Sequence, residues 1–400
     1  NHCITLMASL AFFKVRLMKN FFTKIVLAVC VLHSLFFIVS CSSIQIPFPL
    51  EHSASDWSMA GKNTSRTSFD STSVVRPPFQ LLWQYDATAG FGNSALTVVD
   101  SVVFFGTLQG ELYAISALTG KRFGYLKTHS SISGAPVIFK NNIYFGTETG
   151  KENFISYDVK DGSERWSKNI GGVTASPLLY NGKIFIGGGD GTLYCFDPLD
   201  GAAQWKYETG VPIFSSACAE HSLVFAANTK GTIFALHEKN GTCVWKQEIH
   251  SSIMSGLTVK NGILYFGARD NFLYAVDALN GSVLWKYNAG AKIMSTPALN
   301  DSLVVVSSLN GMVHALSLRD GTARWTFQAK SAVNTTPAIT PTAIIVASLD
   351  TRMYVLSPQD GSVLWSYEIG SRIKTSPIVW GNRILIAAED KIVYCFISSP

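Results

Sequence analysis

The residue types that catalyse reactions or bind metals do not occur here at the spacings that such chemistry needs. The string HEKNG, residues 237–241, begins like a zinc-protease motif but lacks the second histidine. No Cys-x-x-Cys pair for zinc, no Cys-x-x-Cys-His site for covalent haem and no Gly-x-Ser-x-Gly nucleophile elbow is present. The string GGGDG, residues 187–191, lacks the Lys-Ser/Thr of a phosphate-binding loop. We therefore predict no metal site and no catalytic residues of these kinds.

The charge distribution also argues against a nucleic-acid-binding protein. The chain has 400 residues and a formal net charge of +5. Four of its cations, Lys14, Arg16, Lys19 and Lys24, precede residue 41 in a stretch without acids, which leaves about +1 for the rest. A nucleic-acid binder usually shows a basic stripe or patch, and we expect no such partner.

The first part of the chain reads as an export signal. A short basic start at Met18 is followed by an apolar run over residues 25–39 and a small residue before Cys41. The run is shorter than the roughly 20 apolar residues of a membrane-spanning helix, which is the alternative interpretation. The ending IVSC resembles the bacterial lipoprotein signal, and this implies that Cys41 is acylated and becomes the mature N-terminus. Residues 18–40 are then a lipoprotein signal peptide, and residues 1–17 are interpreted as an upstream extension.

A repeat of about 40 residues dominates the remainder. Tryptophans recur at intervals of 39 or 40, each preceded by a glycine four residues earlier. These positions are Trp166, Trp205, Trp245, Trp285, Trp325 and Trp365, with Gly162, Gly201, Gly241, Gly281, Gly321 and Gly361. Residues 174–208 contain four short stretches of β-branched and aromatic residues separated by Asn-Gly and Asp-Gly turns. Four antiparallel strands per repeat are typical of a propeller blade.

The two ends of the chain complete the count of repeats. Seven full units are followed by a last unit that stops before its outer strand. The missing strand is found at residues 79–86, where Trp83 precedes the matching position of the first full unit, which holds Gly124. We predict an all-β fold: an eight-bladed β-propeller of four-stranded antiparallel blades with tryptophan-docking repeats over 79–400. Its last blade is closed by the N-terminal strand, and residues 41–78 form a lipidated tether and lead-in.

The tryptophans and glycines are expected to hold the blades together. We predict that each indole lies over the bare backbone of its own turn glycine and against the small residue of a neighbouring repeat. A buried tryptophan covers roughly 150–250 Å², which is worth at most ~4–6 kcal/mol at ~25 cal/mol per Å². Cys195 and Cys395 occupy the small-residue position, and we interpret them as small apolar side chains that fill this space.

The repeats resemble the tryptophan-docking repeats of pyrroloquinoline quinone (PQQ)-type propellers. The resemblance rests on SYDVKDGSERW, CFDPLDGAAQW and AVDALNGSVLW, and the lead-in DWSMAGKNTSRTS (56–68) is similar to the segment before the ring in that family. This resemblance implies a site for PQQ and calcium at the mouth of the ring, as in the family's enzymes. Calcium needs several oxygen ligands, and no carboxylate occurs in the loops 171–176, 211–216, 251–256, 291–296, 331–336 and 371–376. We therefore expect neither PQQ nor calcium, although other turns carry Asp190, Asp270, Asp350 and Asp390.

The same loops predict a candidate partner-binding site. One column of the repeat is expected to pack between blades: Phe91, Ile132, Val173, Ile213, Ile253, Ile293, Val333 and Ile373. The next column should face the central channel because side chains alternate along a strand: Gly92, Ser133, Thr174, Phe214, Met254, Met294, Asn334 and Lys374. Phe214, Met254 and Met294 would form an apolar arc beside Lys292, Arg372 and Lys374. Such an arc suits a protein partner, or it simply fills the channel.

Together these features resemble the outer-membrane β-barrel assembly lipoproteins (BamB-like). The resemblance implies a noncatalytic, monomeric scaffold anchored by lipid at the periplasmic face of the outer membrane, with the barrel-assembly machinery as its protein partner. Two alternatives stay open: a PQQ-dependent quinoprotein dehydrogenase-like enzyme, and a periplasmic or surface module that binds peptide or glycan.

Overall fold

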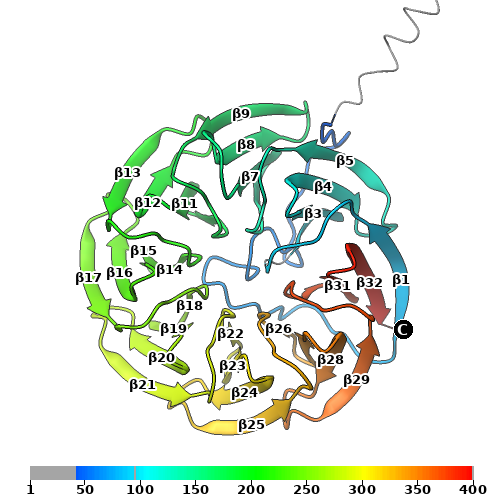
Figure 1. Ribbon diagram of the computed structural model, residues 1–400, viewed down its shortest axis with the longest axis vertical. Helices are drawn as coiled ribbons and strands as arrows, with labels where there is room; N and C mark the ends of the chain where they lie inside the picture. Colours follow the sequence, from blue (N-terminus) through cyan, green and yellow to red (C-terminus); the bar gives the residue numbers. More distant parts are fainter. Residues whose placement is uncertain (1–41, 94–95, 399–400) are drawn as a thin grey trace, which may run out of the picture. The chain divides into compact units, whose positions relative to one another are not determined.

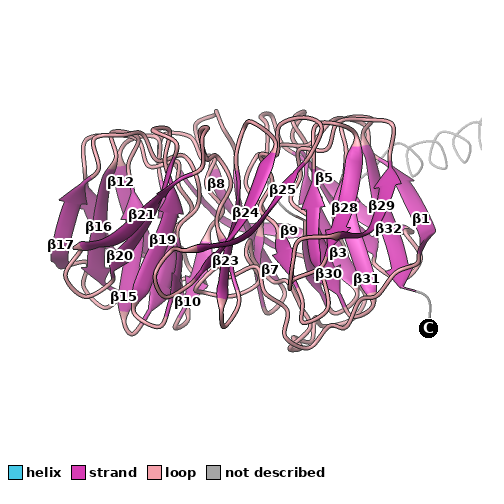
Figure 2. Ribbon diagram, turned by 90° about the horizontal axis from the view of Figure 1, so that it is seen from below, coloured by secondary structure: helices cyan, strands magenta, loops and turns pink. Residues whose placement is uncertain are grey.

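The computed structural model describes residues 42–93 and 96–398, which contain no helix. Residues 43–398 form one compact unit whose strands make eight antiparallel sheets of four strands, arranged as blades around a central axis (Figures 1 and 2). The predicted all-β, eight-bladed propeller is thus confirmed. The predicted extension, the signal peptide and Cys41 lie outside the described residues. In the part of the chain that is described, no helix is long and apolar enough to cross a membrane.

Each blade has an inner strand next to the axis and a second strand beside it. The inner strands are β2 (Thr97–Val99), β6 (Val137–Phe139), β10 (Leu178–Tyr180), β14 (Cys218–Glu220), β18 (Thr258–Lys260), β22 (Ala298–Leu299), β26 (Ala338–Ile339) and β30 (Ile378–Trp380). The second strands are β3 (Val102–Gly106), β7 (Asn142–Gly146), β11 (Lys183–Gly187), β15 (Leu223–Ala227), β19 (Ile263–Gly267), β23 (Leu303–Ser307), β27 (Ile344–Ala347) and β31 (Arg383–Ala387).

The third and outer strands complete the blades, which are numbered 1 to 8 from β2 onward. The third strands are β4 (Glu111–Ser116), β8 (Phe154–Asp158), β12 (Thr192–Phe196), β16 (Thr232–His237), β20 (Phe272–Asp277), β24 (Met312–Ser317), β28 (Arg352–Leu356) and β32 (Ile392–Ser398). The outer strands are β5 (Arg122–Lys127), β9 (Ser163–Lys168), β13 (Ala203–Glu208), β17 (Cys243–Glu248), β21 (Val283–Asn288), β25 (Ala323–Gln328), β29 (Val363–Glu368) and β1 (Phe79–Asp86).

The ring closes through blade 8, whose outer strand is β1 from the start of the propeller. β1 pairs antiparallel with β32, and Trp83 lies opposite Cys395 in the register. The same tryptophan-to-small-residue pairing occurs inside other blades, for example between Trp285 and Ala275. The predicted closure by the N-terminal strand is therefore confirmed, and it removes the open sheet edge that a chain of separate blades would expose.

The core lies between the blades because both faces of a blade pack against its neighbours. β15 is buried along its whole length, and its sequence LVFAA is apolar throughout rather than alternating. The outer strand β21 instead exposes every second side chain and the residue beside its turn. The repeat thus encodes a ring of stacked sheets with one solvent-facing edge.

Six of the seven docking tryptophans contact the turn glycine of the next blade, which corrects the prediction that each indole covers its own glycine. The seventh, Trp365, packs against Phe79 with ring centroids 5.1 Å apart. A Cβ on Gly281 would lie 2.6 Å from Trp245, and one on Gly321 would lie 2.6 Å from Trp285. The equivalent pairs are Trp83 with Gly120, Trp166 with Gly201, Trp205 with Gly241, and Trp325 with Gly361. The small residue is also placed differently, since it lies opposite the tryptophan in the same blade. Each unit therefore takes part in two seams.

The seam between blades 1 and 2 lacks a tryptophan and is filled by the start of the lead-in segment, defined here as residues 43–78. Gly124 occupies the tryptophan position, and a Cβ there would collide with the carbonyl oxygen of Ser43. Gln45 takes the place of the indole, with its Cγ 2.8 Å from a Cβ built on Gly162. The glycine at 124 thus makes room for this segment to complete the seam.

Candidate binding site at the mouth of the ring

The residues predicted to pack between blades are buried at the entrance to each inner strand. Ile213, at the start of blade 4, lies against Gly187 at the end of β11 in blade 3. Ile293 contacts Gly267 in the same way, and any side chain at that glycine would collide with it. This column therefore spaces neighbouring blades.

The next column faces the central channel. All eight of its members line one cavity of about 540 Å³: Gly92, Ser133, Thr174, Phe214, Met254, Met294, Asn334 and Lys374. Phe214, Met254 and Met294 come from blades 4, 5 and 6, and each is half-buried. The structure thus brings the predicted apolar arc together, and Phe91 and Leu108 add further apolar surface to the lining.

The predicted cations around the arc separate into two groups. Arg372 and Lys374 both pair with Glu389, and the Arg372 Nε to Glu389 Oε2 distance is 2.5 Å. The hydrogen bond from Lys374 is the main reason that the pKa of Glu389 lies below its usual range. Lys292 is exposed and is not part of the cavity lining.

Two carboxylates near the mouth were missed by the sequence analysis. Glu148 lines the cavity and accepts a hydrogen bond from Ser133, while Glu389 forms ion pairs with two cations of blade 8. Both lie in the turn between the second and third strands of a blade. The signal was available, because Glu389 stands directly before Asp390 in a turn type that was already identified.

The aspartates of these turns are engaged in structural hydrogen bonds. Asp190 Oδ2 accepts from the hydroxyl of Tyr194 at 2.6 Å, and its Oδ1 accepts from the N–H of Thr192 at 2.9 Å. Asp270, Asp350 and Asp390 make the same pair of contacts in blades 5, 7 and 8. Burial, followed by Asp190, raises the pKa of Tyr194 to about 12, so the hydroxyl stays a donor.

The mouth does not fit a calcium ion with a quinone. Calcium is held by six to eight oxygens, usually with several carboxylates. The turn aspartates lie on separate blades, and each accepts a hydrogen bond from a tyrosine hydroxyl. Over residues 42–93 and 96–398, no three His, Cys, Asp or Glu side chains come together as a group that could hold a metal.

The lead-in segment crosses the centre of the ring (Figure 1), and its residues Trp57, Gly61 and Arg66 line a small cavity there. One residue of the inner strand donates its N–H to a lead-in carbonyl in six blades. These bonds are Val98 to Trp57, Ile138 to Ser58, Ala219 to Thr64, Val259 to Ser65, Leu299 to Thr67 and Ile339 to Ser68, at 2.8–3.0 Å. The segment predicted as tether and lead-in is thus tied to most of the ring.

Arg66 anchors this segment as a fully buried cation. Its guanidinium donates to the carbonyl oxygens of Ser176 (2.8 Å), Pro177 (3.0 Å), Ala60 (2.9 Å) and Ala217. Burial lowers the pKa of Arg66 to about 10, so it remains charged at neutral pH. A smaller cavity of about 90 Å³ lies between Arg66 and hydroxyl groups of the segments that lead into the inner strands. Four carbonyls satisfy the charge without a carboxylate, and the three from Ser176, Pro177 and Ala217 fix the segment to blades 3 and 4.

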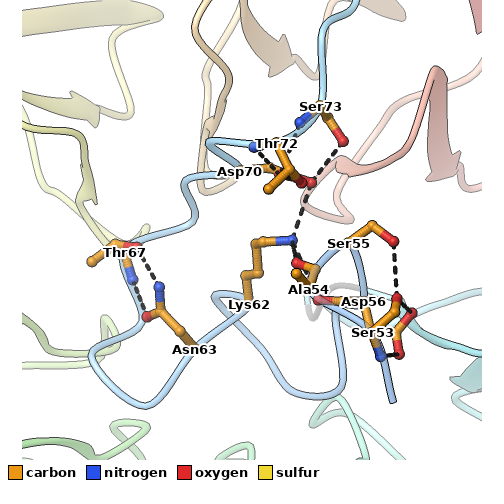
Figure 3. Close-up of polar contacts among 10 residues, drawn as sticks. All are labelled: Ser53, Ala54, Ser55, Asp56, Lys62, Asn63, Thr67, Asp70, Thr72 and Ser73. Atoms are coloured by element: carbon orange, nitrogen blue, oxygen red, sulfur yellow. Dashed lines mark hydrogen bonds and ion pairs between the residues drawn. The ribbon is translucent and has the colours of Figure 1, made fainter. Parts of the chain in front are cut away.

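Lys62 holds the two ends of the central crossing together. Its Nζ lies 3.1 Å from Asp70 Oδ2 and donates to the carbonyl of Ala54 at 3.0 Å (Figure 3). Asp70 also accepts hydrogen bonds from the hydroxyls of Thr72 and Ser73. Because both charged groups are largely buried and fully bonded, this pair serves the fold of the lead-in rather than a ligand.

The four cysteines in the described chain are free thiols. Cys195 and Cys395 are buried opposite Trp205 and Trp83, as expected for small fillers. Burial raises the pKa of both thiols to about 12, so neither is a thiolate at neutral pH. Buried thiols of this kind do not act as activated nucleophiles.

Comparisons with known proteins agree on the architecture. A family model described as "Outer membrane protein assembly factor BamB" matches residues 79–207 and 229–399. The structure of BamB from Moraxella catarrhalis has a TM-score of 0.69 and 19% identity, covering 80% of this chain and 100% of that one. Quinohemoprotein alcohol dehydrogenase ADHIIG from Pseudomonas putida HK5 has a TM-score of 0.75 and 13% identity, covering 86% and 80%. At these identities, the structural likeness shows the fold alone.

Curated relatives match a smaller part of the chain. Lanthanide-dependent methanol dehydrogenase from Methylacidiphilum fumariolicum (strain SolV) is 25% identical over 157 residues, which are 34% of this chain and 24% of that protein. Quinohemoprotein alcohol dehydrogenase from Comamonas testosteroni is 22% identical over 181 residues, 38% and 25% of the two chains. The chain spans about a quarter of the length of the curated relatives it matches.

Proposed function

This chain belongs to the family of the outer membrane protein assembly factor BamB, and from that premise we propose that it is a noncatalytic scaffold for outer-membrane protein assembly. In this proposal the protein is exported, acylated at Cys41 and held at the periplasmic face of the outer membrane. Its partner is a subunit of the barrel-assembly machinery, and it binds as a monomer without PQQ or calcium.

The lining of the mouth carries this proposal. It combines an apolar arc with hydroxyl and amide groups. Its charged members are also engaged: Lys374 pairs with Glu389, and Glu148 accepts a hydrogen bond from Ser133. Half-exposed methionines and aromatic side chains suit an adaptable protein contact. A redox site would instead need cofactor ligands, and the turn aspartates that could supply them are bonded to tyrosines.

A pull-down from detergent-solubilised membranes tests the proposal. The full chain, with its own signal and a C-terminal tag, is expressed in its bacterial host, and the captured proteins are identified by mass spectrometry. We expect a barrel-assembly subunit to be recovered with it. Reproducible absence of any such subunit, from a sample in which the tagged protein is folded, would overturn the proposed role.

The dehydrogenase alternative is supported by the likeness to quinoproteins in fold and in part of the sequence. It predicts that the purified protein binds PQQ in the presence of calcium, with a visible chromophore and a raised melting temperature. Our proposal predicts neither effect. Stoichiometric binding of PQQ would favour the enzyme, even if the pull-down also recovered a partner.

A further inference from the structure

The first described residues are fixed to the outer rim of the ring. Ile44 and Ile46 are fully buried, and the N–H of Ile46 donates to the carbonyl of Val159 at 2.7 Å. The N–H of Ile44 donates to the hydroxyl of Tyr157 at 3.2 Å. Together with Gln45 on Gly162, these contacts hold the segment in the seam between blades 1 and 2, beside β5 (Figure 1).

The chain leaves very little length between this seam and the predicted lipid. Cys41 precedes Ser43 by two residues, so their Cα atoms can be separated by no more than ~7 Å at ~3.3–3.6 Å per residue. An acyl group on Cys41 would therefore bring the rim at blades 1 and 2 directly to the membrane surface. A ring joined to its lipid by a long flexible linker would have no such preferred edge.

The exposed side chains at this rim suit a lipid surface. Phe123 on β5 is 36% exposed and meets Phe48 of the lead-in edge to face, with ring centroids 5.9 Å apart. Lys121 and Arg122 lie next to Phe123 and are exposed. Aromatic rings that enter the headgroup region beside cations that face anionic lipids are typical of interfacial membrane contacts.

We propose that the rim of blades 1 and 2 is the membrane-facing edge of the protein, with Phe48 and Phe123 in contact with the bilayer and Lys121 and Arg122 near its anionic headgroups. The proposal rests on the proposed acylation of Cys41. It places the ring edge-on, with β21 and β25 on the side farthest from the bilayer, since they lie across the ring from β5 and β9 (Figure 1). The mouth then opens sideways, where a periplasmic protein domain can reach it.

Fluorescence quenching by nitroxide-bearing lipids tests this orientation. The background is Cys243→Ser, because the other described cysteines are buried. A fluorophore is attached to Lys121→Cys, which leaves both phenylalanines in place, or to the matched control Leu284→Cys on the exposed outer strand of blade 5. The acylated protein is reconstituted in vesicles of phosphatidylethanolamine and phosphatidylglycerol.

We expect quenching at residue 121 to be several times stronger than at residue 284. Equal quenching at the two sites in protein whose acylation is verified by mass spectrometry would overturn the orientation and leave the scaffold role intact. Protein that reaches the periplasm without an acyl group on Cys41 would overturn the anchoring and the orientation together.

Discussion

The indole of Trp245 lies on Gly281, the turn glycine of the next blade, where an added Cβ would come within 2.6 Å of the ring. Trp285, four residues after that glycine, covers Gly321 in the blade after it. The tryptophan and the glycine of one unit therefore act in two different seams. The repeat that defines this family of sequences closes the ring, and binding must be sought in residues that the repeat leaves free to vary, such as Phe214 and Met254.

The contact at Gly281 gives a prediction with an internal control. Gly281 and Gly262 both have a positive φ, 79° and 75°, but a Cβ at Gly262 would meet nothing within 4 Å. We expect Gly262→Ala to cost about 1–2 kcal/mol for the left-handed backbone. Gly281→Ala should cost about 1–3 kcal/mol more, because the indole must also move. Urea unfolding of the two variants measures the difference, and equal losses would show that the indole contact does not require the glycine.

The indole N–H groups of Trp245 and Trp285 differ in hydrogen bonding, so we expect replacement of the two tryptophans to destabilise the protein unequally. Trp245 Nε1 donates to the carbonyl of Ala278 at 2.9 Å. Trp285 Nε1 is buried and makes no hydrogen bond to a described residue. Replacement by phenylalanine should therefore destabilise the protein by about 1 kcal/mol more at position 245 than at position 285, since only the first loses a bond. Urea unfolding midpoints of the two variants give this difference, and a larger loss at 285 would contradict it.

The sequence predicted the ring because each blade repeats the same pattern of strands and turns. It could not decide which glycine a tryptophan covers: Gly281 lies four residues before Trp285 and 36 after Trp245, and both separations recur with the period. The contacts of segments outside the repeat could not be predicted either. Nothing periodic indicates that Gln45 would replace an indole or that Arg66 would bind four carbonyls. The apolar arc was predictable, because the segment that enters each inner strand recurs with the period, and one of its columns faces the channel in every blade.

Because His314 is buried, we expect the unfolding free energy of the protein to depend on pH. His314 is buried between blades 5 and 6, where Tyr287 Oη lies 3.2 Å from Nδ1 and Ser308 Oγ lies 3.4 Å from Nε2. Burial lowers the pKa of His314 below its ordinary value of 6.5, so the unfolded chain binds a proton more readily than the folded one. Its contribution to stability is therefore complete above pH 6.5 and is lost as the pH falls from there toward the folded-state pKa.

The variant His314→Tyr removes this titration and restores the residue found at the same position in blades 5 and 7, Tyr274 and Tyr354. Between about pH 7.5 and pH 5.5, the parent protein should lose about 1 kcal/mol more unfolding free energy than the variant. Urea unfolding at the two pH values measures both changes. Identical pH dependence would mean that His314 is protonated in the folded protein as easily as in the unfolded chain.

The apolar arc can be tested separately from the ring that carries it. Phe214, Met254 and Met294 line an open cavity, so replacing all three with serine removes apolar surface at the mouth and leaves the seams intact. We expect the triple variant to unfold close to the parent midpoint but to recover several times less barrel-assembly subunit from membranes. Serine at Val244, Leu284 and Leu364, which are exposed on outer strands, serves as the matched control and should leave capture unchanged. Full capture by a folded triple variant would show that the arc only fills the channel and that the partner binds elsewhere on the ring.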